Sequence, residues 1–147
     1  MLKRVFLLFY LFVAFPFGLF ATSSAAQGDE ISLLDGSGEA VAYIAVDDEM
    51  TIYLWGGKPV AYLDGEDVYG FNGKHLGWFL EGAIFDHKGD AVCVLKGRHR
   101  SPKYEGYKGY KAYKPYKSYT EYAPYKPYFS NRFSAVPCSL ALGMGSK

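Results

Sequence analysis

His75 and His87 are the residues of this chain best suited to metal or acid–base chemistry. Each lies two residues from the glycine of a predicted turn. Two neutral imidazoles together with Asp86 or Asp90 would supply the three protein ligands that a catalytic zinc site uses. The histidines belong to different segments, so the alternative is that each forms a structural hydrogen bond within its own turn.

A second polar group is acidic and consists of residues 47–49, Asp64, Glu66 and Asp67. If these loops gather at one end of the fold, their oxygens would suit Ca²⁺, which takes six to eight oxygen ligands. The loops lack the ligand spacing of known calcium loops. The alternative is a solvated acidic rim.

Nucleophilic catalysis has no support in the sequence. The chain contains no Gly-x-Ser-x-Gly motif, and no glycine-rich phosphate loop opens a helix. We therefore expect a non-catalytic protein without cofactor or bound metal. A metal-dependent enzyme using His75 and His87 is kept as an alternative.

Tyrosine occupies every third position from residue 104 to residue 128. Polyproline II has three residues per turn, so this period places all the tyrosines on one edge, whereas the interspersed glycines and prolines oppose a helix. Few aliphatic residues are present, which predicts a C-terminal tail that is disordered or in polyproline II conformation. The predicted ligand-binding residues of the tail are Tyr104, Tyr107, Tyr110, Tyr113, Tyr116, Tyr119, Tyr122, Tyr125, Tyr128, Lys108, Lys111, Lys114 and Lys117.

The charge of the chain is divided unevenly. Residues 29–96 carry thirteen carboxylates and four lysines, a net charge of −9, whereas residues 98–132 carry a net charge of +7. Such asymmetry favours a tail that binds an anionic cell-envelope polymer or a membrane surface. Adhesion or tyrosine cross-linking fits the same composition, and a passive spacer is the simplest alternative. Nucleic acid would use similar stacking and charge, but residues 1–26 have the order of a secretory signal peptide, and the export that this predicts argues against nucleic acid.

Four glycines mark a repeat in the body of the chain: Gly38, Gly57, Gly73 and Gly89. The last three are sixteen residues apart, and the first lies nineteen residues before the second. Short β-branched and aromatic runs flank the turn tetrads DGSG, WGGK, FNGK and HKGD, which predicts four β-hairpins that stack or close into a ring. The Asn72-Gly73 pair predicts a two-residue turn with positive φ at both residues.

Aromatic residues recur along these hairpins. Core packing is the simplest account of them, and an axial pocket lined by symmetric aromatics, open to a small apolar or sugar ligand, is the alternative. The residues are Tyr43, Tyr53, Trp55, Tyr62, Tyr69, Trp78 and Phe79.

The run TIYLWGGKPVAYLDGEDVYGFNGKHLGWFLEGAIFDHKGDAVCVL resembles the bacterial four-fold beta flower domain family. The most specific parts are YGFNGKHLGWF, residues 69–79, and the GxIFDxxG of residues 82–89. The resemblance covers about residues 31–95, and the first copy departs from it most. It implies an all-β domain of four hairpins around a pseudo-four-fold axis, and it implies no activity.

The N-terminus has the order of a secretory signal peptide: two basic residues, an apolar run from residue 5 to residue 20, then small residues before Gln27. An uncleaved anchor is the alternative. In an oxidising compartment Cys93 and Cys138 would be able to pair. Otherwise Cys93 is a small buried residue, and Cys138 is free or joined to another chain.

These observations predict three parts: a signal peptide (residues 1–26), a four-hairpin domain (27–97) and a low-complexity tail (98–147). The predicted function is that of a secreted or periplasmic, non-catalytic protein whose tail tethers it to the envelope. The alternatives are a small-ligand binding module with an axial pocket and the metal-dependent enzyme.

Overall fold

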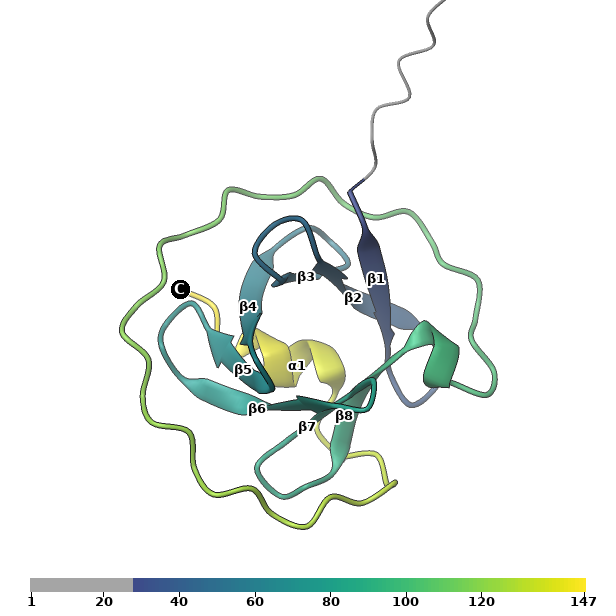
Figure 1. The fold of residues 1–147 in the computed structure, drawn as a ribbon. Helices are drawn as coiled ribbons and strands as arrows, with labels where there is room; N and C mark the ends of the chain where they lie inside the picture. Colours follow the sequence, from purple (N-terminus) through teal and green to yellow (C-terminus); the bar gives the residue numbers. More distant parts are fainter. Residues whose placement is uncertain (1–27) are drawn as a thin grey trace, which may run out of the picture.

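The computed structural model describes residues 28–147, and the predicted signal peptide lies outside them. Eight antiparallel strands pair in chain order, and β1 also pairs with β8, which closes the sheet into a barrel (Figure 1). The strands are β1 (Glu30–Leu34), β2 (Ala40–Ala45), β3 (Thr51–Leu54), β4 (Pro59–Asp64), β5 (Asp67–Gly70), β6 (His75–Leu80), β7 (Ala83–Phe85) and β8 (Ala91–Leu95). They form four consecutive hairpins, which confirms the predicted all-β fold.

The four hairpin turns share one geometry. In the turn between β5 and β6, the Gly73 N–H donates to the Gly70 carbonyl (3.0 Å), and the Gly70 N–H donates to the Lys74 carbonyl (2.8 Å). This is a three-residue loop in which Gly73 alone takes the left-handed conformation, with a φ of +87°. The predicted two-residue turn is therefore wrong. Asn72 does not have a positive φ, and its side-chain oxygen instead accepts the Lys74 N–H.

Each hairpin also carries one β-bulge, at the same place relative to the turn, in which its second strand has one residue more than its first. A bulge bends its strand and increases the local twist, so four equivalent bulges help the sheet close evenly. The shifts fall between Leu33 and Leu34, Ile52 and Tyr53, Val68 and Tyr69, and Ile84 and Phe85.

Aliphatic side chains fill the barrel interior. Ile44, Ile52, Val60 and Val68 are all buried in one cluster. Because strand side chains alternate between faces, their aromatic neighbours lie on the outer surface of the barrel. The interpretation of an axial pocket lined by aromatic residues is therefore wrong. Phe79 packs partly against the interior cluster, and the other aromatics lie outside it, as in the cluster around Tyr43.

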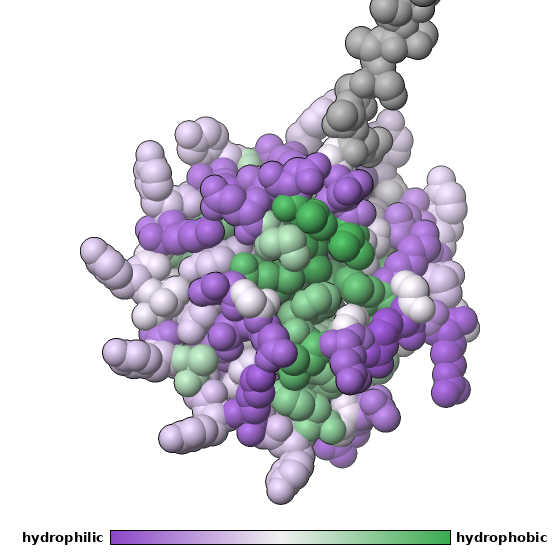
Figure 2. Space-filling view, in the orientation of Figure 1, coloured by the Kyte–Doolittle hydropathy of each residue, from purple (hydrophilic) through white to green (hydrophobic). Residues whose placement is uncertain are grey.

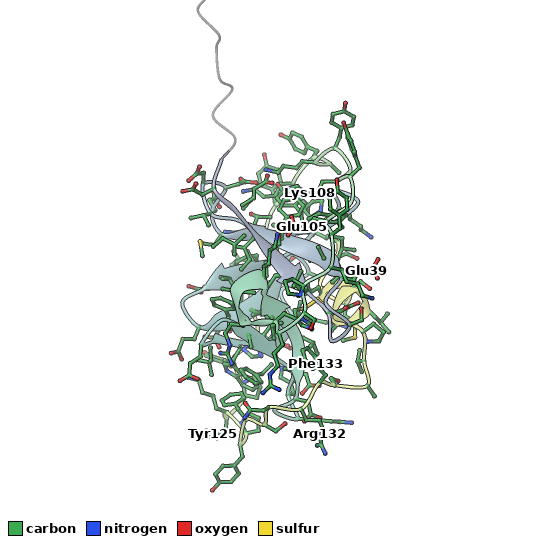
Figure 3. The ribbon with its side chains drawn as sticks, turned by 90° about the vertical axis from the view of Figure 1, so that its right-hand side faces the viewer. Glu39, Glu105, Lys108, Tyr125, Arg132 and Phe133 are labelled. Atoms are coloured by element: carbon green, nitrogen blue, oxygen red, sulfur yellow. A yellow bond between two sulfur atoms is a disulfide. The ribbon has the colours of Figure 1, made fainter. Side chains whose placement is uncertain are left out.

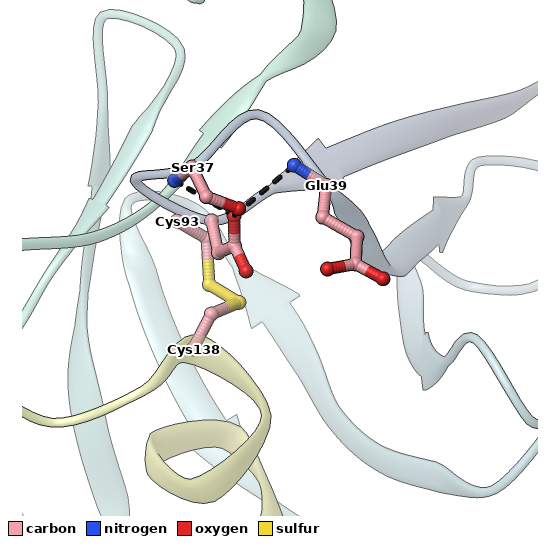
Figure 4. The surroundings of a disulfide bond; sticks show 5 residues. Ser37, Glu39, Cys93 and Cys138 are labelled. Carbon is pink, nitrogen blue, oxygen red and sulfur yellow. Dashed lines mark hydrogen bonds between the residues drawn. A yellow bond between two sulfur atoms is a disulfide. The ribbon is translucent and has the colours of Figure 1, made fainter. Parts of the chain in front are cut away.

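One short helix, α1 (Cys138–Gly143), packs against the interior cluster through its buried residues Cys138, Ala141 and Leu142. Figures 1 and 3 place it across one end of the barrel. A disulfide joins Cys138 to Cys93 of β8, with a Cα–Cα distance of 5.3 Å (Figure 4). The C-terminus therefore belongs to the folded body. Within residues 28–147, no helix is long and apolar enough to cross a membrane.

After η1 (Lys96–Arg98), residues 101–132 encircle the barrel (Figure 1). We call this segment the collar. Its residues 104–128 form no helix or strand and lie in an extended path, as the polyproline II alternative requires. The prediction of a tail separate from the domain at residue 97 is corrected, because backbone hydrogen bonds attach the collar to every hairpin turn.

Candidate functional site

The collar is attached at intervals of nine residues. One collar N–H donates to the carbonyl of each turn glycine, at 2.8–2.9 Å. Each nine-residue interval contains three of the three-residue repeats that begin with tyrosine. The period of the tyrosines therefore fits a whole number of times between successive hairpins of the barrel. The pairs are Lys103 to Gly38, Ala112 to Gly57, Glu121 to Gly73 and Ser130 to Gly89.

The collar lysines face the barrel and pair with its carboxylates. Glu30 accepts from both Lys108 and Lys111, and its side chain is only 14% exposed. Three further lysines complete the set. The pairs are Lys114 with Asp48 (2.7 Å), Lys117 with Glu49 (3.1 Å) and Lys126 with Glu66. Three of the six acids predicted to form a solvated rim or a calcium site therefore bind the collar instead.

The same lysines cover the outer aromatic clusters. Tyr43 stacks on Tyr53 with ring centroids 5.5 Å apart, and the Lys108 ammonium lies 4.6 Å from the centre of the Tyr43 ring. On the next hairpin, the Lys117 ammonium lies 4.2 Å from the centre of the Tyr62 ring. Cation–π attraction at such distances contributes about 0.5–2 kcal/mol. The predicted ligand-binding lysines therefore hold the collar to the barrel.

The tyrosines face the opposite way. All nine are between 90% and 102% exposed, so their rings pack against nothing in the folded chain. Figure 2 shows side chains projecting around the rim of the molecule, and Tyr125 points away from the barrel in Figure 3. The predicted single aromatic edge is thus present, wound into a ring.

The two histidines lie in contact although they come from different hairpins. The nitrogens His75 Nδ1 and His87 Nε2 are 2.9 Å apart, and His75 Nε2 lies 2.9 Å from Asp67 Oδ1. The His75 side chain is fully buried. Its backbone N–H donates to the Glu121 carboxylate of the collar at 2.7 Å.

This arrangement fixes the hydrogen positions of a neutral pair. An ionised Asp67 only accepts, so His75 donates from Nε2 and accepts at Nδ1 from His87 Nε2–H. His87 Nδ1 is then an acceptor, and no residue among 28–147 donates a hydrogen bond to it. Burial, with a smaller contribution from His75, lowers the pKa of His87 below its ordinary value, which keeps this ring neutral near pH 7. The pair offers one free nitrogen, and residues 28–147 contain no group of three potential metal ligands.

Comparison with known proteins identifies the family of the chain. The family model described as 4-fold beta flower protein matches residues 31–142. The chain belongs to the 4-fold beta flower family. The match extends beyond the four hairpins of the beta flower through the collar and into α1, so it covers the elements that the sequence resemblance left out. No curated protein and no solved structure gives a significant match to the chain.

The contact between collar and barrel predicts sensitivity to acid. Hydrogen bonds from Lys114 and Tyr53 lower the pKa of Asp48, and the hydrogen bond from Lys117 lowers that of Glu49. Burial alone would raise the pKa of Glu30, but Lys108 and Lys111 lower it overall. Carboxylates with lowered pKa values stabilise the fold above their unfolded pKa, and this contribution is lost as the pH falls through the folded value.

We therefore expect the urea midpoint to fall gently below about pH 6.5, because the pKa of His87 is lowered in the fold, and to fall more steeply below about pH 4.5 as the carboxylates become protonated. Urea unfolding at a series of pH values measures this. The double variant E30Q/D48N is uncharged at these two positions at every pH, so its urea midpoint is expected to decline less steeply. Equal slopes for the variant and the unmodified protein would contradict the assignment.

Proposed function

We propose that this beta flower protein is an exported, non-catalytic protein of the cell envelope that attaches to a glycan polymer through its ring of tyrosines. The observation that carries the proposal is the full exposure of nine tyrosines around the perimeter. Tyrosine offers a large, rigid, amphipathic contact surface at low conformational cost, and it is enriched at binding interfaces for that reason. A passive spacer would not need nine such rings on one edge.

Two observations support export. The N-terminal residues have the order of a signal peptide. The Cys93–Cys138 disulfide is of the kind that forms and persists in oxidising compartments.

The inward-facing lysines change the kind of contact that is expected. Five of them pair with barrel carboxylates, so their charges are not free to attract an anionic polymer. We propose that the polymer is held by stacking on the tyrosine faces and by hydrogen bonds to the hydroxyls. Binding of this kind depends weakly on salt, whereas attraction between exposed charges is screened as the Debye length falls from about 10 Å at 0.1 M to about 3 Å at 1 M.

The test is sedimentation of the protein with insoluble peptidoglycan at 50 mM and 500 mM salt. We expect the unmodified protein to bind with less than a threefold change between the two. A variant with all nine tyrosines replaced by serine is expected to lose at least tenfold in affinity and to keep its fold, because the rings make no packing contacts. Lys58→Ser, at a hairpin turn outside the collar, is the surface control. Equal binding by the serine variant would overturn the proposal.

A further inference from the structure

At one place in the four-fold repeat, polar residues stand at three positions where the other hairpins have none of the same kind. His75 lies two residues after a turn glycine, and His87 lies two residues before the next one. Glu121 is the collar residue that bonds to a turn glycine. Each of these three positions recurs in the other hairpins. The counterparts of the two histidines are apolar: Ala40, Pro59 and Ala91 for His75, and Gly36, Trp55 and Phe71 for His87. The collar counterparts are Lys103, Ala112 and Ser130, none of which is acidic. All three exceptions meet between the third and fourth hairpins.

A cavity of about 580 Å³ opens at this place. The cavity is surrounded by the third and fourth hairpins, by the collar at Glu121, and by α1 with the residues that precede it. Its volume is within the range of sites for small molecules, about 300–1,000 Å³. One wall is aliphatic, formed by Leu76, Val92, Val136 and Met144.

The other wall is polar and nearly balanced in charge. Lys74 and Lys88 offset Asp86 and Glu121, while Asp90 is paired with Arg132 at 3.2 Å. No excess charge is left to select an ion.

The chain of hydrogen bonds from Asp67 through His75 makes His87 Nδ1 an acceptor. A ligand group that pairs with His87 Nδ1 must therefore donate a hydrogen bond, as a hydroxyl does and a carboxylate does not.

We propose that this cavity binds a neutral amphiphile with a hydroxyl-bearing head and a short hydrocarbon chain. The hydroxyl donates to His87 Nδ1, and the hydrocarbon chain lies along the wall of Leu76, Val136 and Met144. Asp67 and His75 are positioning residues, since they fix which His87 nitrogen carries the hydrogen. The site is separate from the tyrosine ring and does not depend on the function proposed for it.

Calorimetric titration of the full folded protein at pH 8 tests the proposal with three probes. These are n-octyl β-D-glucoside below its micelle-forming concentration, octanoate, and glucose. We expect saturable binding of one octyl glucoside per chain. Octanoate, which has no donor, and glucose, which has no chain, are each expected to bind at least tenfold more weakly. Absence of octyl glucoside binding, or equal affinity for octanoate, would overturn the proposal.

Variants separate the two walls of the cavity. His87→Phe keeps a planar ring without the acceptor nitrogen, and Met144→Ser shortens the aliphatic wall; each is expected to weaken octyl glucoside binding at least fivefold. The matched controls are His99→Phe and Leu140→Ser. His99 lies outside the cavity. Leu140 lies in α1, and Met144 directly follows α1; their exposed fractions are similar (60% and 56%), but Leu140 does not line the cavity. Equal losses in variant and control would contradict the assignment.

The hydrogen positions have a readout that needs no ligand. Long-range ¹H–¹⁵N spectra are expected to show His87 with its hydrogen on Nε2 and a bare Nδ1. In Asp67→Asn the side-chain amide is able to donate to His75 Nε2 and reverse the chain, so the preference for octyl glucoside over octanoate should fall. A hydrogen on His87 Nδ1 in the unmodified protein, or an unchanged preference in Asp67→Asn, would overturn the positioning role.

Discussion

Removal of the Cys93–Cys138 disulfide is expected to lower the free energy of unfolding by about 3–4 kcal/mol. The two cysteines are 45 residues apart in the sequence. Cross-links that close loops of this length restrict the unfolded chain by an amount between those for loops of about 15 and about 100 residues. The closed loop contains the whole collar, so the bond also fastens both ends of the segment that encircles the barrel. Breaking it frees α1 from the interior cluster as well.

The variant C93A/C138A measures this effect in urea unfolding followed by tryptophan fluorescence. Trypsin provides a second readout, because Lys108, Lys111 and Lys117 face the barrel and become accessible when the collar detaches. A thiol reductant is expected to destabilise the unmodified protein and to leave the variant unchanged. A loss below about 1 kcal/mol would mean that the collar and α1 are held without the bond.

The hairpins were predictable because their signals are local. Each turn glycine lies between two short apolar runs, and loops of this kind need a positive φ at one residue. The length of the loop was less predictable. The two-residue turn expected at Asn72-Gly73 proved to have three residues, because a type I turn followed by a left-handed glycine uses the same sequence.

The direction of the aromatic side chains was not predictable from alternation. A strand with one solvated face alternates apolar and polar residues, but both faces of these strands are covered, one by the interior and one by the collar. Tyr43 and Ile44 are equally buried, at 1% exposure each. The sequence pattern therefore does not tell inside from outside.

The attachment of the collar depends on contacts between residues more than 40 positions apart, such as Ala112 with Gly57. Low aliphatic content predicted a free tail because the collar has no core of its own. Two signals were nevertheless present. The body and the tail have opposite net charges of similar size, and three tyrosine triplets match the nine-residue spacing of the hairpin contacts.

The contact between His75 and His87 needed the ring closure as well as the repeat. They lie on opposite sides of successive turn glycines, and β6 pairs with β7, which brings the third and fourth hairpins together. The sequence alone left their distance open. The role of Glu121 was missed altogether, although it is one of only two acidic residues in the basic segment.

Gly57→Ala is expected to detach the collar locally and to cost more than the same change at Gly65. Both glycines have a positive φ, +98° and +61°, so alanine is strained at either position by about 1–2 kcal/mol. A Cβ at Gly65 would meet nothing within 4 Å, whereas at Gly57 it would lie 1.9 Å from the Tyr110 carbonyl oxygen of the collar. The difference between the two variants therefore reports the collar contact together with the larger backbone strain of alanine at a φ of +98°.

We expect Gly57→Ala to be less stable than Gly65→Ala by a further 1–3 kcal/mol, the usual cost of overpacking a close contact. Urea unfolding measures the difference, and amide hydrogen exchange locates it. The Ala112 N–H, which donates to the Gly57 carbonyl, should exchange faster in Gly57→Ala and normally in Gly65→Ala. The Glu121 N–H, bonded to Gly73 one hairpin further on, should keep its protection, since each hairpin holds its own nine-residue stretch of the collar. Equal costs with unchanged exchange at Ala112 would show that the collar does not depend on its contact with the turn glycines.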